Sequence, residues 1–311
     1  MIVKRIVVLF AFVMALWSCN EDDGGGAPAP EPPRALSEVL AEDEVKIQEY
    51  LKTHYYNYAE FQNPPENFDY KIKLQVIPEG NTDTIPLIDQ VQSKTINVSS
   101  SAEGGEVDVP HTYYYLVARE GAGISPTVAD STFVIYEGTL LDDTRFDGID
   151  NYVWQYLPFF LRGYAAGISN MKSGGDIISY DDGTYSITDT GIGMVVMPSG
   201  LGYFNNSPVT IPPYSPLVFT FDVGTIVENT DYDRDGVPSI LEDVNNDSDL
   251  NNDNTDEDFI SQGVPGFNHR DPDDDNDGIP TRDEIVLDAQ GNFVSFLDSD
   301  GDGISDHLDA D

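Results

Sequence analysis

The sequence predicts an α+β fold built mostly of antiparallel strands, on three observations. Short runs with alternating apolar residues follow Tyr113, the clearest being STFVIYEGTLL. A stretch after Pro158 has helical spacing instead, with apolar side chains at Leu161, Tyr164 and Ile168. Of 311 residues, 40% are hydrophobic and 11% aromatic, which is enough apolar material for a packed core. These patterns define the class of the fold but not its topology.

The first 18 residues are typical of an export signal. Lys4 and Arg5 precede an apolar run, 6–17, that is too short to span a bilayer. The chain's one cysteine, Cys19, follows this run in LWSC, which resembles a bacterial lipobox. We therefore expect residues 1–18 to be removed and Cys19 to carry a lipid that anchors the protein to a membrane. The alternative is a buried or free thiol.

Residues 19–34, with the sequence CNEDDGGGAPAPEPPR, are polar, acidic and rich in Gly and Pro. This composition predicts a flexible tether. An acidic cluster directly after the cysteine resembles the surface-export signal of Bacteroidetes lipoproteins. It predicts an outer-membrane lipoprotein of the cell envelope, periplasmic or surface-exposed. An ordinary solvated linker is the alternative.

Residues 35–110 are predicted to form a helical and β extension packed on the domain that follows. Ser37 is a candidate N-cap for a helix through EVLAEDEVKIQEYLKTHYYNY, and the segments YKIKLQVIP and KTINVSS have strand composition. A surface for self-association is the alternative role. The apolar face of the helix is expected to comprise Leu40, Val45, Ile47, Tyr50 and Leu51.

Residues 111–227 supply the remaining predicted strands, TYYYLVARE, STFVIYEGTLL, VVMP and LVFTFDV, and a helix in FFLRGYAAGISNMK. Between them, GGDIISYDDGTYSITDTGIG has the Gly, Asp and Thr content of a β-hairpin.

Residues 228–311 differ sharply in composition, with 26 acidic residues against 3 basic ones. Such a balance ordinarily predicts disorder. The acids are nevertheless ordered as D-x-D-x-D-G, and the first two copies are followed by Glu at the spacing of a calcium loop. A degenerate fourth copy spans residues 249–253. The predicted ligands are Asp231, Asp233, Asp235 and Glu242; Asp273, Asp275, Asp277 and Glu284; and Asp298, Asp300, Asp302 and Asp309.

Calcium suits these loops because alternate residues of a tight turn direct their oxygens inward and Gly allows the sharp bend. The flanks contain Pro and are too short for paired helices, so the loops resemble thrombospondin type 3 repeats and not EF-hands. We expect Ca²⁺ as a structural cofactor, with an affinity of about 10⁻⁴ to 10⁻³ M and folding coupled to binding. The alternative is an acidic solubilising tail without ordered metal.

The net charge of −41 argues against a nucleic-acid partner, whose phosphates would be repelled. It also argues against docking on anionic lipid. The four histidines occur in unrelated contexts, without a nucleophile elbow or zinc spacing.

Several separated segments of 111–227 resemble the FKBP-type peptidyl-prolyl isomerases in content and order. They are VIYEG, RFDG, FFLRGY, LGY, IPP and LVFTFDV. Two departures are visible. Tyr164 stands where the family often has Trp, and the chain between Lys172 and Met197 is longer by about one hairpin. The longer stretch can reshape the rim of the pocket.

The resemblance implies an antiparallel sheet curled around a short helix, and a dry pocket for prolyl peptides. Each aromatic residue taken singly could instead be a plain core residue. Tyr203 would donate to the substrate carbonyl, and Asp147 would orient and not act as a base. No cofactor is needed for isomerisation. The implied pocket comprises Tyr136, Phe146, Asp147, Phe160, Leu161, Tyr164, Tyr203, Ile211 and Phe219.

Two functions follow from these observations. The first is a prolyl isomerase of the cell envelope that assists folding of proline-containing exported clients. The second is a non-catalytic, calcium-dependent surface binding or spacer lipoprotein with an FKBP-like clamp.

Overall fold

The computed structural model describes residues 32–100, 105–206, 208–256 and 266–310. The predicted export signal, Cys19 and most of the tether lie outside these residues. Within the described ranges, no helix combines the length and apolarity that crossing a membrane requires.

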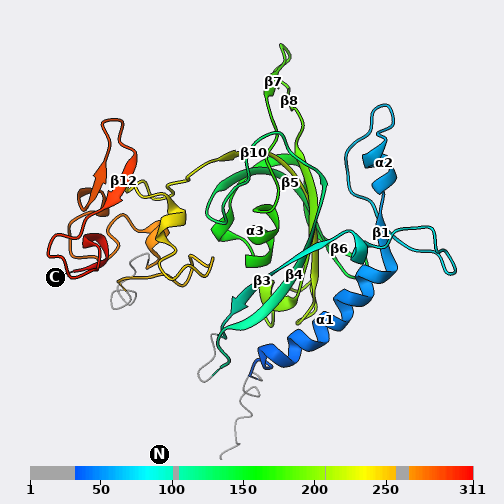
Figure 1. The fold of residues 1–311 in the computed structure, drawn as a ribbon, viewed down its shortest axis with the longest axis horizontal. Helices are drawn as coiled ribbons and strands as arrows, with labels where there is room; N and C mark the ends of the chain where they lie inside the picture. The colour runs from blue at the N-terminus through cyan, green and yellow to red at the C-terminus, as the bar shows by residue number, and fades with distance from the viewer. Residues whose placement is uncertain (1–31, 101–104, 207, 257–265, 311) are drawn as a thin grey trace, which may run out of the picture. The chain divides into compact units, whose positions relative to one another are not determined.

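A six-stranded antiparallel sheet forms the centre of the fold, in the order β3-β4-β9-β10-β5-β6 (Figure 1). The predicted mixed helix-and-sheet class is therefore confirmed. Residues before position 111 also belong to the sheet, because β3 pairs along its length with β4. The strands are β3 (Gln92–Val98), β4 (Val109–Arg119), β5 (Ser131–Leu140), β6 (Arg145–Tyr156), β9 (Gly191–Met197) and β10 (Leu217–Val227).

The helix α3 (Arg162–Ile168) packs on the inner face of the sheet, and every residue after Arg162 in it is buried. Figure 1 shows the strands curling around this helix. Two glycines allow the close approach. A Cβ on Gly163 would lie 2.1 Å from Met197 Sδ, and one on Gly167 would lie 2.8 Å from Val195. The small residues of GYAAG thus let the helix lie directly against β9.

The helix α1 (Leu36–Thr53) covers the outer face of the same sheet. Alternation along β9 explains how one strand serves both faces, because Val195 packs in the inner core and Val196 in the outer core. The outer core comprises Ile47, Tyr50, Leu51, Tyr56, Leu87, Leu116, Met194, Val196 and Val218.

Three details of the predicted helix are wrong. It ends at Thr53 and is followed by a short strand, His54–Tyr56. The helix begins at Leu36, so Ser37 is not its cap, and the Ser37 amide donates to Glu106 Oε2 at 2.9 Å. Val45 is 70% exposed, whereas Asp43 is fully buried. The Asp43 carboxylate accepts hydrogen bonds from the Ser199 amide (2.8 Å) and hydroxyl (2.6 Å). The buried face of the helix therefore includes the hydrogen-bonded Asp43 and not the predicted Val45.

The long edge strand β6 is not among the strands predicted from the sequence. Its sequence, RFDGIDNYVWQY, mixes polar and apolar residues, and its pairing with β5 is interrupted by two register shifts. An edge strand with one open side needs no clean alternation. The predicted hairpin is present as β7 (Ile177–Ser179) and β8 (Tyr185–Ile187), with Ile177 and Ile178 exposed.

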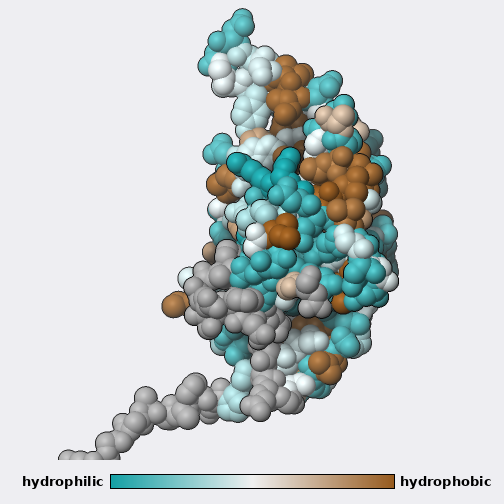
Figure 2. Space-filling view, turned by 90° about the vertical axis from the view of Figure 1, so that its left-hand side faces the viewer, coloured by the Kyte–Doolittle hydropathy of each residue, from teal (hydrophilic) through white to brown (hydrophobic). Residues whose placement is uncertain are grey.

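Short elements complete the described chain. The face drawn in Figure 2 is mostly hydrophilic, with hydrophobic surface in separate patches. The remaining strands and α-helix are β1 (His54–Tyr56), β2 (Leu74–Val76), β11 (Ile285–Leu287), β12 (Phe293–Phe296) and α2 (Tyr58–Gln62). The 3-10 helices are η1 (Leu87–Asp89), η2 (Leu157–Phe159), η3 (Ser199–Leu201), η4 (Ser239–Glu242), η6 (Asn268–Arg270), η7 (Thr281–Asp283) and η8 (Asp306–Leu308).

Candidate functional site

The inner face of the sheet and the start of α3 carry a group of mainly aromatic side chains, here called the aromatic cup. Seven of the nine residues that the sequence predicts for the pocket lie in or against one hydrophobic core cluster, while Phe160 stacks on Tyr164 and Asp147 is hydrogen-bonded to Tyr136. Phe160 is the most open of the apolar ones, at 37% exposed, whereas Ile211 is buried. The cup comprises Tyr136, Phe146, Phe160, Leu161, Tyr164, Tyr203, Ile211 and Phe219.

Tyr164 lies at the centre of the cup, with 1% of its surface exposed. Its ring is edge-on to Tyr136 (centroids 5.6 Å apart, 86°) and to Phe219 (5.0 Å, 85°), while Phe160 stacks on it at 5.3 Å. Such edge-to-face pairs are a favourable arrangement of aromatic rings. The buried Tyr164 hydroxyl donates to Gln155 Oε1, at 2.5 Å. Burial raises the pKa of Tyr164, so the hydroxyl stays protonated.

Gly138 on β5 makes room for two of these rings. A Cβ there would lie 2.7 Å from both Phe146 and Phe219. Those two rings meet edge to face at 5.5 Å. Neither Gly138 nor Gln155 is among the residues predicted from the sequence. A glycine between β-branched and aromatic strand residues is the signal that points to Gly138.

One edge of the cup is polar. The Tyr136 hydroxyl donates to Asp147 Oδ2 at 3.0 Å, and the Gly148 amide donates to Asp147 Oδ1 at 2.8 Å. Burial, and then the hydrogen bond to Asp147, raise the pKa of Tyr136 to about 12. Burial also raises the pKa of Tyr203, with a smaller contribution from Asp147. Both hydroxyls therefore remain donors at neutral pH.

Asp147 is the one charged side chain among the predicted pocket residues, and it is exposed. With both oxygens accepting hydrogen bonds, it can hold a hydroxyl in place. The surface of the cup is otherwise apolar, which suits binding of an apolar group and not hydrolysis. A cavity of about 170 Å³ is lined by Ile135, Thr220 and Asp222, which alternate with cup residues along their strands, and its lining also includes Tyr136.

A second set of functional candidates lies in the acidic loops after β10. The three predicted loops share one backbone geometry. In each, the fifth-position aspartate accepts a hydrogen bond from the amide two residues on, at 2.7 Å for Asp235, 2.6 Å for Asp277 and 2.8 Å for Asp302. The loop glycines have positive φ, at 105° for Gly236, 96° for Gly278 and 100° for Gly303.

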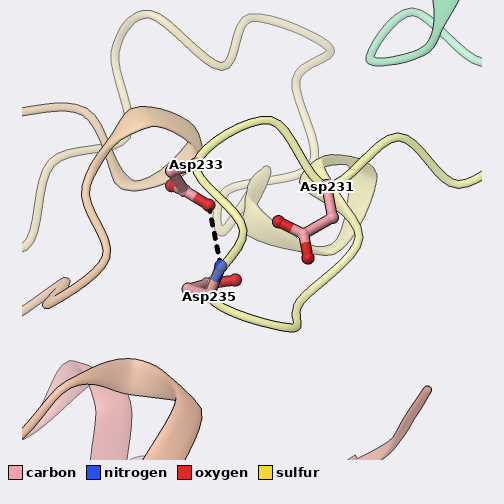
Figure 3. A group of neighbouring side chains, drawn as sticks. All are labelled: Asp231, Asp233 and Asp235. Atoms are coloured by element: carbon pink, nitrogen blue, oxygen red, sulfur yellow. Dashed lines mark hydrogen bonds between the residues drawn. The ribbon is translucent and has the colours of Figure 1, made fainter. Parts of the chain in front are cut away.

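The first three aspartates of each loop gather their carboxylates within 4.8 Å of one another. Figure 3 shows Asp231, Asp233 and Asp235 turned toward the inside of the first loop. The second loop gathers Asp273, Asp275 and Asp277 in the same way, and the third gathers Asp298, Asp300 and Asp302, which are exposed.

Glu242 lies next to Asp235, a member of the group that its spacing predicts, and a residue of the second loop joins them. That residue is Asp274, and all three are buried and within 4.8 Å of one another. Among the described residues, both carboxylate oxygens of Glu242 and of Asp274 have no hydrogen-bond partner. The motif gives no role to Asp274, because it falls between two ligand positions. Only the folding of one loop against the other places it here.

Burial dominates the electrostatics of these acids. Desolvation, followed by repulsion from neighbouring carboxylates, raises the pKa of Glu242 to about 11, of Asp274 to about 9 and of Asp233 to about 8. The pKa of Glu284 is raised to about 7 by burial and then by Asp275, Asp277 and Asp273. Glu284 therefore lies beside the second group. Asp309 is not among the gathered groups. Clustered, buried oxygens that repel one another fit a hard divalent cation.

Comparison with known proteins gives a partial match. No protein-family model matches the sequence. FKBP-type peptidyl-prolyl cis-trans isomerase FkpA of Escherichia coli K12 is 30% identical over 115 residues, and its counterpart in E. coli O157:H7 gives the same values. The match covers 35% of this chain and 36% of the relative. The chain thus spans about a third of the length of the curated relatives.

Two solved structures are also similar. A peptidyl-prolyl cis-trans isomerase from Pseudomonas syringae pv. tomato DC3000 aligns with a TM-score of 0.34 and 16% identity, covering 64% of this chain and all of the other. E. coli FkpA aligns with a TM-score of 0.33 and 20% identity, covering 62% of each chain. The predicted FKBP resemblance is therefore supported for about a third of the chain by the curated relatives.

Proposed function

We propose that residues 111–227 catalyse cis/trans isomerisation of X-Pro bonds in polypeptides. The observation that carries the proposal is the aromatic cup, closed below by Tyr164 and bordered by the Tyr136–Asp147 hydrogen bond. Sequence similarity to FkpA over 115 residues supports it.

The chemistry needs no nucleophile. The barrier to rotation is about 18–20 kcal/mol and arises from the partial double-bond character of the amide. A twisted amide has lost that conjugation and is less polar than the planar one. An apolar cup formed by Phe146, Tyr164 and Phe219 favours the twisted form over the planar form, which lowers the barrier.

The polar edge supplies orientation. Asp147 fixes the Tyr136 hydroxyl, and Tyr203, also protonated, is the donor proposed for the substrate carbonyl. A hydrogen bond held in place before the substrate arrives costs little ordering at the moment of reaction. We therefore expect apolar residues before proline to be preferred, because the cup around the peptide is apolar.

Turnover of a short X-Pro peptide by the full chain tests this proposal. We expect faster cis/trans exchange than in peptide alone, and inhibition by an excess of a second proline peptide. Wild-type protein that binds the peptide without accelerating exchange would favour the alternative function, a non-catalytic clamp on a surface spacer protein.

The acidic loops support a second activity, binding of divalent cations, with Ca²⁺ as the candidate. The observation behind it is the set of buried carboxylate oxygens in Asp235, Glu242 and Asp274 that have no hydrogen-bond partner within the described part of the chain. These residues and the two loop groups of Asp231–Asp235 and Asp273–Asp277 would hold the ions. Isothermal titration of the full chain with CaCl₂, and with MgCl₂ as the control, tests it. If neither CaCl₂ nor MgCl₂ gave a binding heat, the result would contradict the proposal.

Lipidation of Cys19 and a place at the outer membrane, facing the periplasm or the medium, complete the proposal. The short apolar run before LWSC motivates them. In this setting the clients would be exported proteins that contain proline. Mass spectrometry of the N-terminus in the membrane fraction is the measurement, and a free thiol at Cys19 would contradict the proposal. Protease added to whole cells distinguishes the two faces.

A further inference from the structure

The buried acidic trio Asp235, Glu242 and Asp274 joins two loops that are more than thirty residues apart in sequence. Each of the three residues is at most 2% exposed. Among the described residues, Asp235 Oδ2 and both carboxylate oxygens of Glu242 and of Asp274 have no hydrogen-bond partner. Three buried carboxylates facing one another repel strongly unless a cation lies between them. A single ion there would tie the first loop to the second.

The first loop also contacts Tyr156 and Phe159, which precede the cup residues Phe160 and Leu161 in the chain. Tyr232 lies between the ligand candidates Asp231 and Asp233, and its ring stacks on Tyr156 with centroids 4.3 Å apart and planes 10° apart. The same ring meets Phe159 edge to face at 5.0 Å.

The segment before the second loop contacts the same two residues. His269 Nδ1 is hydrogen-bonded to the Tyr156 hydroxyl at 2.9 Å. The Arg270 guanidinium lies over the Phe159 ring at 5.7 Å. Tyr156 and Phe159 are thus held from two sides, and both sides meet at the acidic trio.

Tyr156 and Phe159 belong to residues 156–162, a segment that also contains the cup residues Phe160 and Leu161. This segment is called the wall of the cup. Its far end is also held by the acidic region. Arg162 Nε lies 3.3 Å from Asp249 Oδ2, and Asn251 Nδ2 donates to the Pro158 carbonyl at 2.8 Å. Because Phe160 stacks on Tyr164, any shift of this segment changes the floor and rim of the cup together.

We propose that one divalent cation, held by Asp235, Glu242 and Asp274, sets the position of Tyr156–Arg162 and so couples cation binding to the shape of the aromatic cup. This proposal rests on the cation binding proposed above. Loss of the ion separates the two loops, withdraws Tyr232 and His269 from Tyr156, and loosens the wall that carries Phe160. Peptide binding in the cup then depends on calcium.

Hydrogen exchange of the full chain, with CaCl₂ and after chelation, tests the coupling without relying on activity. Peptides covering residues 155–162 report on the wall, which includes the Leu157 amide bonded to the Asp130 carbonyl and the Phe160 amide bonded to that of Leu157. We expect calcium to slow their exchange at least tenfold. Asp274→Asn should abolish this effect, while the matched variant Asp300→Asn, in the exposed third loop, should retain it.

Tyr232→Ala separates binding from coupling, because it removes the stacked ring but no carboxylate. We expect it to bind calcium in calorimetry and yet to show no calcium effect at residues 155–162, with Tyr232→Phe restoring the effect. Calcium binding without slower exchange in the wild-type wall, or an unchanged effect in Asp274→Asn, overturns the coupling. An absence of calcium binding overturns the cation proposal as well. If calcium slows hydrogen exchange at residues 155–162 but the chain has no isomerase activity, the coupling stands and only the isomerase proposal is contradicted.

Discussion

The aromatic cup and the first two acidic loops both contain buried side chains, but burial has opposite consequences in the two regions. Removing a large apolar side chain such as Phe219 from water stabilises the fold by about 1.5–3 kcal/mol. Removing a carboxylate such as Glu242 from water costs several kcal/mol. The sheet core around Phe219 is therefore expected to form without an ion, whereas the loops need one to offset their own burial. Side chains with similar exposure thus form a core that is stable without an ion in one region and a core that needs an ion in the other.

The largest effect on stability should come from removing calcium, which destabilises the loops. An ion present at ~10–100 times its Kd stabilises a site by about 1.4–2.7 kcal/mol, so three sites are worth about 4–8 kcal/mol. We expect chelation to make residues after Glu228 sensitive to protease while the sheet stays resistant. Limited proteolysis with mass spectrometry of the fragments is the measurement. Equal sensitivity with and without calcium would reduce the loops to a solvated acidic chain.

Phe219→Ala should have the complementary effect, on the sheet. Truncating a buried Phe typically costs about 3–5 kcal/mol, and Phe219 contacts Tyr136, Phe146 and Tyr164. We expect the sheet to unfold at a lower urea concentration in the presence and absence of calcium alike. Calcium titration should still show binding to the loops. A variant that lost calcium binding as well would show that the two regions fold as one unit.

The pH dependence of stability should also separate the regions. The pKa values of Asp274 (about 9) and Asp233 (about 8) lie above their ordinary value, chiefly through burial. The folded loops thus bind more protons than the unfolded ones, so metal-free stability should be greatest at low pH and fall as pH rises through these values. Urea unfolding of the metal-stripped chain at pH 5, 6.5 and 8 measures this. Saturating calcium should remove the trend, and a metal-free stability that rises with pH would contradict the assignment.

Tyr136→Phe should affect catalysis with little change in stability. It removes the hydroxyl bonded to Asp147 but keeps the ring that packs on Tyr164. We expect kcat/KM for an X-Pro peptide to fall about tenfold, equivalent to about 1.4 kcal/mol of transition-state stabilisation. Asp147→Asn, which retains an acceptor, is the matched control and should lose less. Equal activity of Tyr136→Phe and wild type would assign the cup's effect to apolar contact alone.

Ile177→Ser should have the smallest effect. This residue is 54% exposed on the β7–β8 hairpin, so it is neither a buried ring nor a buried acid. Surface substitutions of this kind usually change stability by less than about 0.5 kcal/mol. Thermal unfolding and peptide turnover should both match wild type. A marked loss of turnover would show that the hairpin takes part in client binding.

The sequence predicts more of the cup than of the loop interior. Alternation along STFVIYEGTLL and LVFTFDV places Tyr136 and Phe219 on one face, and family resemblance supplies the rest. The spacing of the loop aspartates likewise predicts three gathered groups. Glu242 and Asp274 were not predictable together, because their contact depends on how two distant loops pack. Gln155 escaped notice for the same reason, since its partner is the Tyr164 hydroxyl on another element.

The buried bond between Asp43 and Ser199 bears on how this protein can be shortened for expression. A fragment trimmed to residues 111–227 loses α1 and β3 together. The Ser199 amide then has no carboxylate, β4 becomes a bare edge, and the apolar outer face around Met194 and Val218 meets water. Unpaired edges and uncovered apolar faces promote self-association. A fragment beginning at Arg34 keeps all three features covered and is the shortest start we expect to stay monodisperse.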